Sequence, residues 1–133
     1  MHAFLQDARI RKLSDDFSRV GIFQAPTGKS LKFQFDLPGG EQVTVGYIDY
    51  HLKLWTDTTC RPPYEVCHMY LVELAKALDL EVRKAKQNPN IWTLCRDGGI
   101  PSIEPLWPKL HLWPPIARKF SEQMFQAYVP PLR

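Results

Sequence analysis

PPYEVCHMYLVELAKALDLEVRKAK, residues 62–86, is the stretch of this chain that decides the fold. After two prolines, apolar side chains recur at positions i, i+3, i+4, i+7 and i+11 of one helical face. They are Cys67, Tyr70, Leu71, Leu74 and Leu78. The spacing predicts a helix that ends near Asp79. Because strand-like sequence lies on both sides of the helix, we expect a sheet to dock on its apolar face.

The hydrophobic period changes after this helix. Leu80 and Val82 alternate with charged residues, which predicts a strand, although residues 80–86 are also compatible with a longer helix. The turn signal Asn-Pro-Asn follows at 88–90, and residues 91–96 form a matching strand. The sequence therefore predicts a hairpin after the helix.

A first hairpin is predicted before the helix, after a loop at residues 25–30. Residues 31–36 alternate between apolar and polar, and Pro-Gly-Gly at 38–40 supplies turn residues. The return strand begins at Val43 and continues to Leu54, but its apolar phase slips by one residue at Gly46. A β-bulge at Gly46-Tyr47 explains the slip, and a break that gives two strands is the alternative.

Helices are expected at both ends of the chain. Residues 3–20 carry an apolar stripe that ends at Gly21, and Ser14 is an alternative cap for a shorter helix. The last helix is expected to start at Pro115. The fold class is therefore α+β: a single compact domain over residues 1–133, with an antiparallel sheet of about four strands packed by about three helices in the order α-β-β-α-β-β-α.

Composition narrows the class of protein. With 133 residues, 44% of them hydrophobic, the chain can bury a core. Its net charge of +3 is too small to indicate a nucleic-acid-binding surface. The three cysteines form no CxxC pair, and no run approaches the ~18 apolar residues of a membrane span. We therefore expect a cytoplasmic protein with no membrane partner.

The segment 98–115, GGIPSIEPLWPKLHLWPP, is rich in proline and contains Leu-Trp-Pro twice, at 106–108 and 112–114. This proline density argues against a long helix or a central strand, so we expect an extended loop, partly polyproline II. Tryptophan is enriched among interface hot spots. The alternative is a lid whose rings fold back over the sheet or the last helix. The binding residues predicted here are Trp107, Lys109, His111 and Trp113.

A catalytic interpretation rests on the predicted long strand. Asp49, His51 and Lys53 share its polar face, and Asp36 lies on the neighbouring strand. Such residues can transfer protons, stabilise an anion or hold a metal ion. A solvent-facing strand surface explains the same alternation, so we assign no catalytic residue and lean against an enzyme.

The cysteines and histidines offer candidate residues for a metal site or a nucleophile. Five of these could ligate zinc, but their spacing matches no compact zinc knuckle: Cys60, Cys67, His68, Cys95 and His111. Cys60 precedes the N-terminus of the central helix, where a thiol is activated, with His51 or His68 as its base. Gly-Lys-Ser at 28–30 ends like a phosphate-binding loop, yet a helix precedes it and a strand follows, so a turn is favoured. We predict no metal and no cofactor.

The function expected from the sequence is that of a small cytoplasmic binding or adaptor protein. It engages a protein partner through the 98–115 loop and catalyses no reaction. The alternative is a nucleic-acid-binding protein or a metal-dependent nuclease that uses Asp36, Asp49, His51 and Lys53. Homodimerisation is left open.

Overall fold

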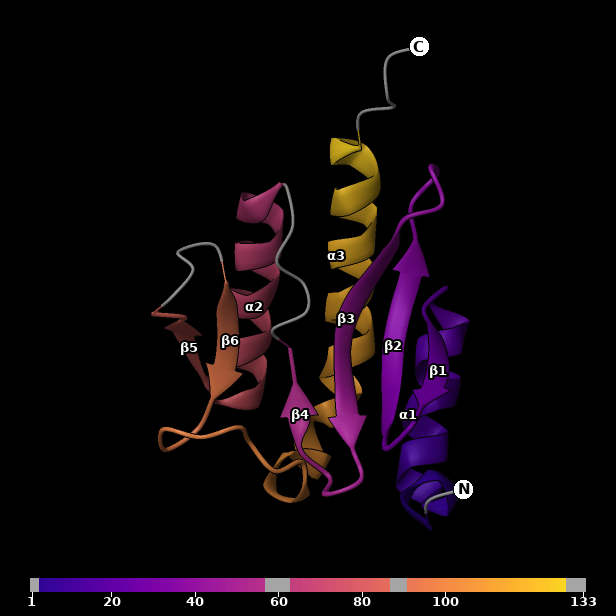
Figure 1. The fold of residues 1–133 in the computed structure, drawn as a ribbon, viewed down its shortest axis with the longest axis vertical. Helices are drawn as coiled ribbons and strands as arrows, with labels where there is room; N and C mark the ends of the chain where they lie inside the picture. The colour runs from indigo at the N-terminus through magenta and orange to yellow at the C-terminus, as the bar shows by residue number, and fades with distance from the viewer. Residues whose placement is uncertain (1–2, 57–62, 87–90, 129–133) are drawn as a thin grey trace.

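The computed structural model describes residues 3–56, 63–86 and 91–128. Within these ranges the chain forms three α-helices, a four-stranded antiparallel sheet and a separate two-stranded sheet (Figure 1), which confirms the α+β class. The elements, with η for a 3₁₀ helix, are η1 (Ala3–Gln6), α1 (Ala8–Arg19), β1 (Phe23–Thr27), β2 (Ser30–Asp36), β3 (Gln42–Asp49), β4 (Leu54–Trp55), α2 (Tyr64–Leu78), β5 (Glu81–Lys84), β6 (Trp92–Cys95), η3 (Glu104–Leu112) and α3 (Trp113–Ala127).

Helix α1 begins at Ala8, not at residue 3. Asp7 is its N-cap and accepts a hydrogen bond from the Arg9 backbone N–H at 2.8 Å, so the four preceding residues form the 3₁₀ turn η1 instead. Ser14 lies buried inside the helix and does not cap it. The helix ends before Gly21, as predicted, and Gly21 takes the left-handed φ of +80° that favours glycine there.

The larger sheet has the strand order β1-β2-β3-β4. The predicted β2–β3 hairpin is confirmed, but the loop expected at 25–30 was wrong, because β1 pairs with β2 from Phe23↔Gln34 to Thr27↔Ser30. Gly28 and Lys29 are left as a two-residue hairpin turn. The alternation that reveals a strand is missing from β1, since this edge strand contains Pro26 and is mostly exposed on both faces.

Strand β3 carries an irregularity close to the predicted bulge. Phe33 pairs with Gly46 while Gln34 pairs with Thr44, so Val45 is the extra residue. A Cβ atom at position 46 would lie 2.9 Å from Trp113 Cζ2. Glycine at this position therefore lets the indole ring of α3 approach the sheet backbone.

The prediction of one strand continuing to Leu54 was wrong. Strand β3 ends at Asp49, a turn follows, and β4 runs back so that Tyr47 pairs with Trp55. The break predicted as an alternative exists, but it lies after Asp49 and not at Gly46. Local side-chain hydrogen bonds to Asp49 stabilise this turn.

Helix α2 confirms the central prediction in extent and in its buried face. It ends at Leu78, and Asp79 adopts a left-handed φ of +57° at its C-cap. Strands β5 and β6 pair as predicted, but as a separate sheet, and the turn predicted at 88–90 lies outside the described residues. The docking surface differs from the expectation, because α2 packs mainly on α3 and on the β5–β6 hairpin. Helix α3 lies between α2 and α1, behind β2 and β3 (Figure 1).

The extended loop predicted for 98–115 was wrong. Pro101–Ile103 runs along the sheet, where the Leu54 N–H donates to Pro101 O at 2.9 Å and the Ile103 N–H to Leu52 O at 2.8 Å. The chain then coils into η3, with Pro108 inside it, and continues directly into α3 at Trp113. Short 3₁₀ turns tolerate proline where its missing N–H is not needed.

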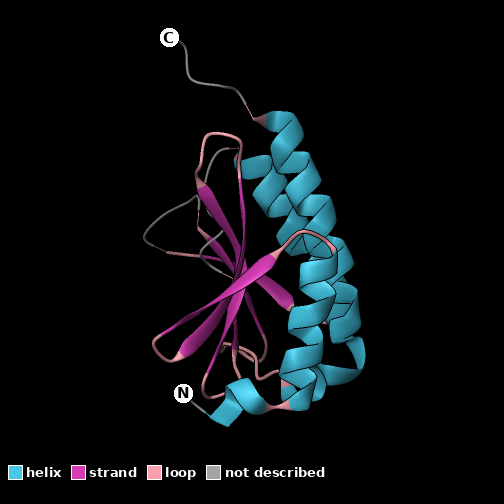
Figure 2. Ribbon diagram, turned by 90° about the vertical axis from the view of Figure 1, so that its right-hand side faces the viewer, coloured by secondary structure: helices cyan, strands magenta, loops and turns pink. Residues whose placement is uncertain are grey.

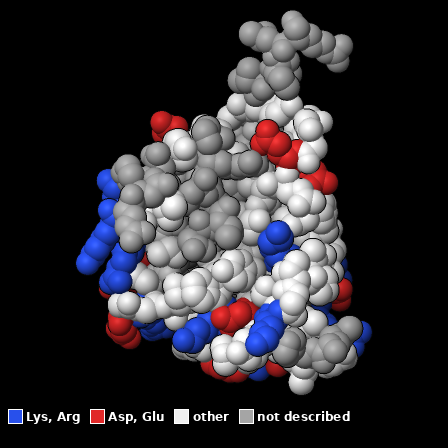
Figure 3. All heavy atoms as spheres, viewed as in Figure 1, with Lys and Arg blue, Asp and Glu red and all other residues white. Residues whose placement is uncertain are grey.

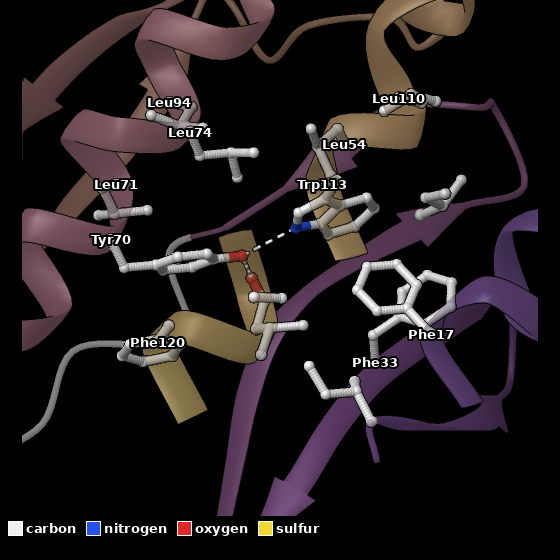
Figure 4. Close-up of a cluster of buried hydrophobic side chains, with 14 of the residues drawn as sticks. Phe17, Phe33, Leu54, Tyr70, Leu71, Leu74, Leu94, Leu110, Trp113 and Phe120 are labelled. Carbon is white, nitrogen blue, oxygen red and sulfur yellow. Dashed lines mark hydrogen bonds between the residues drawn. The ribbon is translucent and has the colours of Figure 1, made fainter. Parts of the chain in front are cut away.

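The helices cover one face of the larger sheet, and none of the described helices lies on the other face (Figure 2). The core between the layers is centred on Trp113, whose ring meets Phe17 and Phe33 edge-on at centroid distances of 4.8 and 5.3 Å. Tyr70 stacks on Phe120 at 4.3 Å (Figure 4). The hydroxyl group of Tyr70 accepts a hydrogen bond from Trp113 Nε1 at 2.8 Å and donates one to Val45 O at 2.7 Å. One contiguous core thus joins α1, α2, α3 and the sheet.

The two longest α-helices, α2 and α3, have 15 residues each. Across the described ranges, no helix combines the length and the apolar character needed to cross a bilayer.

Candidate binding groove between α1 and η3

A groove of about 190 Å³ lies between helix α1 and the 3₁₀ helix η3. Its apolar side is formed by the partly buried Trp107 with the buried Leu13 and Leu110, and charged or polar side chains stand around them. We call this surface the α1–η3 groove; its lining residues are Arg9, Lys12, Leu13, Asp16, Trp107, Leu110 and His111.

Arg9 is held over the ring of Trp107. Its guanidinium carbon lies 4.3 Å from the ring centroid, a cation–π geometry. Two carboxylates fix it there: Asp7 Oδ2 and Glu104 Oε2 each lie 3.2 Å from a guanidinium nitrogen. The hydrogen bonds from Arg9 lower the pKa of the Asp7 carboxyl group, and those to Asp7 and Glu104 raise the pKa of Arg9. Asp7 and Glu104 thus hold the guanidinium group of Arg9 in place within the molecule.

The other charged side chains of the groove are paired in a similar way. Lys12 Nζ lies 3.2 Å from Asp16 Oδ2 across one turn of α1, in the favourable i,i+4 relation. His111 is exposed beside them on η3. The groove is therefore an apolar hollow with a polar rim, whose arginine, lysine and aspartate are already neutralised within the molecule.

The indole N–H of Trp107 is buried and has no hydrogen-bond acceptor among the described residues. A buried donor without an acceptor costs about 1–3 kcal/mol of folding free energy. Phenylalanine or leucine at this position would fill apolar space without that cost.

The structure therefore places the four binding residues predicted from the sequence in different surroundings. Trp107 and His111 line the α1–η3 groove, whereas Lys109 is exposed on η3 outside its lining. Trp113 is completely buried and donates its N–H to Tyr70 (Figure 4), so its prediction as a contact residue was wrong. For Trp113 the alternative of a ring folded back over the sheet is correct.

The polar strand face behind the catalytic interpretation does not exist as predicted. Asp49 is the last residue of β3, and one of its carboxylate oxygens accepts hydrogen bonds from the His51 N–H at 2.8 Å and the Lys53 N–H at 3.1 Å. The other oxygen accepts from Trp55 Nε1 at 2.7 Å. His51 lies in the turn and Lys53 pairs with Ser102, so the three residues do not share one strand. The carboxylate of Asp49 stabilises the turn.

Asp36 lies far from this turn. Asp49 pairs with Ser30 at one end of β2, and Asp36 is the last residue at the other end, six residues along the strand. At about 3.3 Å per residue the two carboxylates are separated by roughly 20 Å. The structure does not bring them to one metal ion.

The cysteines and histidines that the structure describes do not converge either. Cys67 and Cys95 are buried and are not joined in a disulfide, and His68 packs on Trp92 with ring centroids 4.5 Å apart. Cys60, the candidate nucleophile, lies outside the described residues. In the described part of the chain, no group of three or more His, Cys, Asp or Glu side chains is placed to hold a metal ion.

Charge on the helix-free side of the molecule is mixed (Figure 3). Lys and Arg gather at one edge, over the β5–β6 hairpin, where Arg83, Lys84 and Lys86 are exposed. Toward the lower edge of this view, acidic and basic groups lie close to one another. Among the described residues, the view shows a short basic edge and no continuous basic surface.

Sequence reasoning missed Arg9, which shapes the groove. Arg9 lies 98 positions before Trp107, and its carboxylate partner Glu104 comes from the same distant segment. A single sequence carries no signal for a contact over that separation. The same is true of Leu13, whose place on the apolar stripe of α1 indicates burial and nothing more.

No protein-family model, no curated protein and no solved structure matches this chain.

Proposed function

We propose that this chain is a binding protein that captures a protein partner in the α1–η3 groove and performs no reaction there. The observation that carries the proposal is Trp107: its partly buried ring forms the apolar side of the groove, and the guanidinium group of Arg9 is held 4.3 Å above it. Tryptophan and arginine are the residues most often found at the energetic centre of protein interfaces.

The size of the groove supports a protein partner over a small molecule. Sites for small molecules and cofactors typically measure about 300–1,000 Å³, whereas this groove measures about 190 Å³. A volume of that order suits one large apolar side chain that projects from a partner. Anchoring of this kind, with a polar rim around the anchor, is the usual anatomy of a hot spot.

Preorganisation supports the same conclusion. Arg9 is held by Asp7 and Glu104, and the backbone beneath Trp107 is coiled into η3 with Pro108. A partner that docks here orders few side chains, so little conformational entropy is lost on binding. Arg9 and Lys12 at the rim already pair with carboxylates. We therefore expect neither proton transfer nor activation of an anion in the groove.

The proposal is tested with peptides selected from a random-peptide display library against the folded protein. We expect selected peptides to be rich in large apolar residues and to shift the indole N–H signal of Trp107 in ¹H–¹⁵N spectra, the signal being assigned by its loss in Trp107→Phe. Trp107→Ala should weaken their binding by 10-fold or more, about 1.4 kcal/mol or more.

Leu112→Ala is the matched control, since Leu112 is 38% exposed on the same 3₁₀ helix and does not line the groove. It should leave peptide affinity unchanged. If Trp107→Ala lowers the folded fraction, the exposed rim variant His111→Ala replaces it and should weaken binding without a change in stability. Selected peptides that bind all these variants as tightly as the natural protein would overturn the proposal.

A further inference from the structure

The outer edge of strand β5 is open. Strand β5 pairs with β6 on one side only, and no described element lies beyond it on the other side (Figure 1). Helix α2 packs against the pair and leaves β5 at the side of the molecule. We call residues 81–86 the β5 edge; none of them lines the α1–η3 groove.

The register of the pair shows which backbone groups of the β5 edge point outward. The Ala85 N–H donates to Ile91 O at 2.8 Å, so residue 85 faces the β6 side. The direction of backbone hydrogen bonds alternates along an antiparallel strand, so Val82 and Lys84 face away from β6. Among the described residues, none is bonded to the N–H or C=O groups of these two on that side. These are the groups to which an added strand binds.

Two other strand edges lack this opening. On the far side of β6, the Leu94 N–H points away from β5 and donates to Thr56 Oγ1 at 3.1 Å. Strand β1, at the edge of the larger sheet, contains Pro26, which has no N–H to donate. The β5 edge has neither a proline nor a side-chain partner for its outward groups, and charged side chains alone guard it.

Three cations stand on the β5 edge without a carboxylate partner. Arg83, Lys84 and Lys86 are exposed (Figure 3), and none of them forms an ion pair with another described residue. The acidic residue of the strand, Glu81, lies at its other end, where its carboxylate is 4.0 Å from Cys95 Sγ. The cations of the α1–η3 groove, by contrast, are neutralised within the molecule.

These features identify the occupant as an extended acidic segment of a protein. Outward N–H and C=O groups two residues apart match the backbone of another strand, and the unpaired cations match carboxylates. A second copy of β5 would place like charges opposite one another, which is unfavourable. A single-stranded nucleic acid would stack its bases on an aromatic ring. The ring of Trp92 is already packed by the His68 ring, with centroids 4.5 Å apart, and by Lys84 Nζ, 5.8 Å from its centroid.

We infer that the β5 edge is a docking site for an extended acidic segment of a partner protein, which adds as a strand beside β5. The backbone of the segment bonds to the outward groups of Val82 and Lys84, and its carboxylates pair with Arg83, Lys84 and Lys86. The inference is independent of the α1–η3 groove, because the two surfaces share no residue and either can fail alone.

Titration with synthetic peptides tests the inference, with ¹H–¹⁵N spectra of the full chain as the readout. The probe is a short peptide in which glutamate alternates with valine. It should move the amide signals of Val82 and Lys84 downfield and slow their exchange with solvent. The amide of Ala85, which is already bonded, should change little. The same peptide with methyl groups on two consecutive central amide nitrogens should bind about 10-fold more weakly or worse, and a lysine–valine peptide should not bind.

Two substitutions at one position separate the backbone from the charge. Lys84→Pro and Lys84→Gln both remove the charge, but only proline removes the outward N–H, and it spares the bonds to β6 because residue 84 does not face that strand. Lys84→Pro should bind the glutamate–valine peptide about 10-fold more weakly than Lys84→Gln does. Persistent protection of the Ala85 amide shows that the strand pair is intact; if proline disturbs it, the methylated peptide decides.

A charge reversal tests the cations. Arg83→Glu should weaken binding of the glutamate–valine peptide, whereas Lys109→Glu, a reversal at an exposed lysine on η3, should not. A glutamate–valine peptide that does not bind at about 1 mM, that binds equally well when methylated, or that the lysine–valine peptide equals would overturn the inference. Binding of an oligodeoxythymidylate to the same residues in place of the peptide would also overturn it, in favour of a nucleic acid.

Discussion

Tyr70 shows at the scale of one residue how this core combines packing with polar satisfaction. Its ring stacks on Phe120 of α3, and its hydroxyl group links the indole of Trp113 to a carbonyl oxygen of β3. The hydroxyl group thus satisfies two buried polar groups from two different elements. Complete burial raises the pKa of the Tyr70 phenol, and the hydrogen bond from Trp113 opposes this only in part.

Tyr70→Phe is expected to lower the free energy of unfolding by about 1–3 kcal/mol, since it leaves the Trp113 N–H and the Val45 carbonyl group buried without their partner. Urea denaturation measures the change. Tyr64→Phe is the matched control on the same helix, because Tyr64 is 40% exposed, and it should have little effect. Equal stability of the two variants would contradict the role given to the Tyr70 hydroxyl group.

Tyr70→Phe should also change how the free energy of unfolding depends on pH. Because the pKa of Tyr70 is raised in the folded state, the unfolded chain loses this proton first, from about pH 10. Above that pH the folded state binds more protons, so stability should fall as pH rises, by up to about 1.4 kcal/mol per pH unit for this group. The slope contributed by Tyr70 should be missing in Tyr70→Phe.

At the scale of elements, the contact between α3 and β3 fixes the distance between the two layers. Helix α3 begins with Trp113, and the ring of Trp113 reaches the backbone of β3 at Gly46. The extra residue Val45 in β3 turns its carbonyl group towards Tyr70 of α2. The bulge is therefore the place where both helices are joined to the sheet.

Gly46→Ala should be destabilising by about 1–3 kcal/mol, because the added methyl group would meet Trp113 Cζ2 and the Trp55 carbonyl oxygen at 2.9 Å. Thermal unfolding gives the shift. Gly99→Ala serves as control, since a Cβ atom there meets nothing within 4 Å and should change stability by less than about 0.5 kcal/mol. Similar melting temperatures for the two variants would contradict the close approach.

At the scale of the whole molecule, the α1–η3 groove joins two segments that are far apart in the sequence. Its lining comes from α1, near the start of the chain, and from η3, which leads into α3 near its end. The groove therefore depends on the packing of the whole helix layer.

The arrangement of the sheet also makes a prediction about catalysis. Because β2 separates Asp36 from Asp49 by roughly 20 Å and Asp49 stabilises a turn, we expect no Mg²⁺- or Mn²⁺-dependent cleavage of single- or double-stranded DNA or RNA by these residues. Incubation of purified protein with labelled substrates of each kind checks this. Metal-dependent cleavage that Asp49→Asn abolishes without loss of stability would contradict it.

Much of the fold could be predicted from local periodicity. The helical face of α2, the alternation of β2 and the turn at 38–40 each follow from the identity of neighbouring residues, and the structure confirms them. Local patterns succeed here because burial of one face imposes a fixed period on the sequence. Where burial is not one-sided, as in the edge strand β1, the pattern is absent and the strand was missed.

The sequence by itself determined the α+β class, the extent of α2, the two hairpins and the presence of tryptophan at residues 107 and 113. Only the tertiary structure decided which tryptophan is core and which lines a groove, because both occur in the same Leu-Trp-Pro context. Trp113 faces Tyr70 and the bulge of β3, whereas Trp107 lies under Arg9 of α1. Those neighbours come from segments 43 to 98 positions away, and contacts over such separations depend on how the layers pack, not on local sequence.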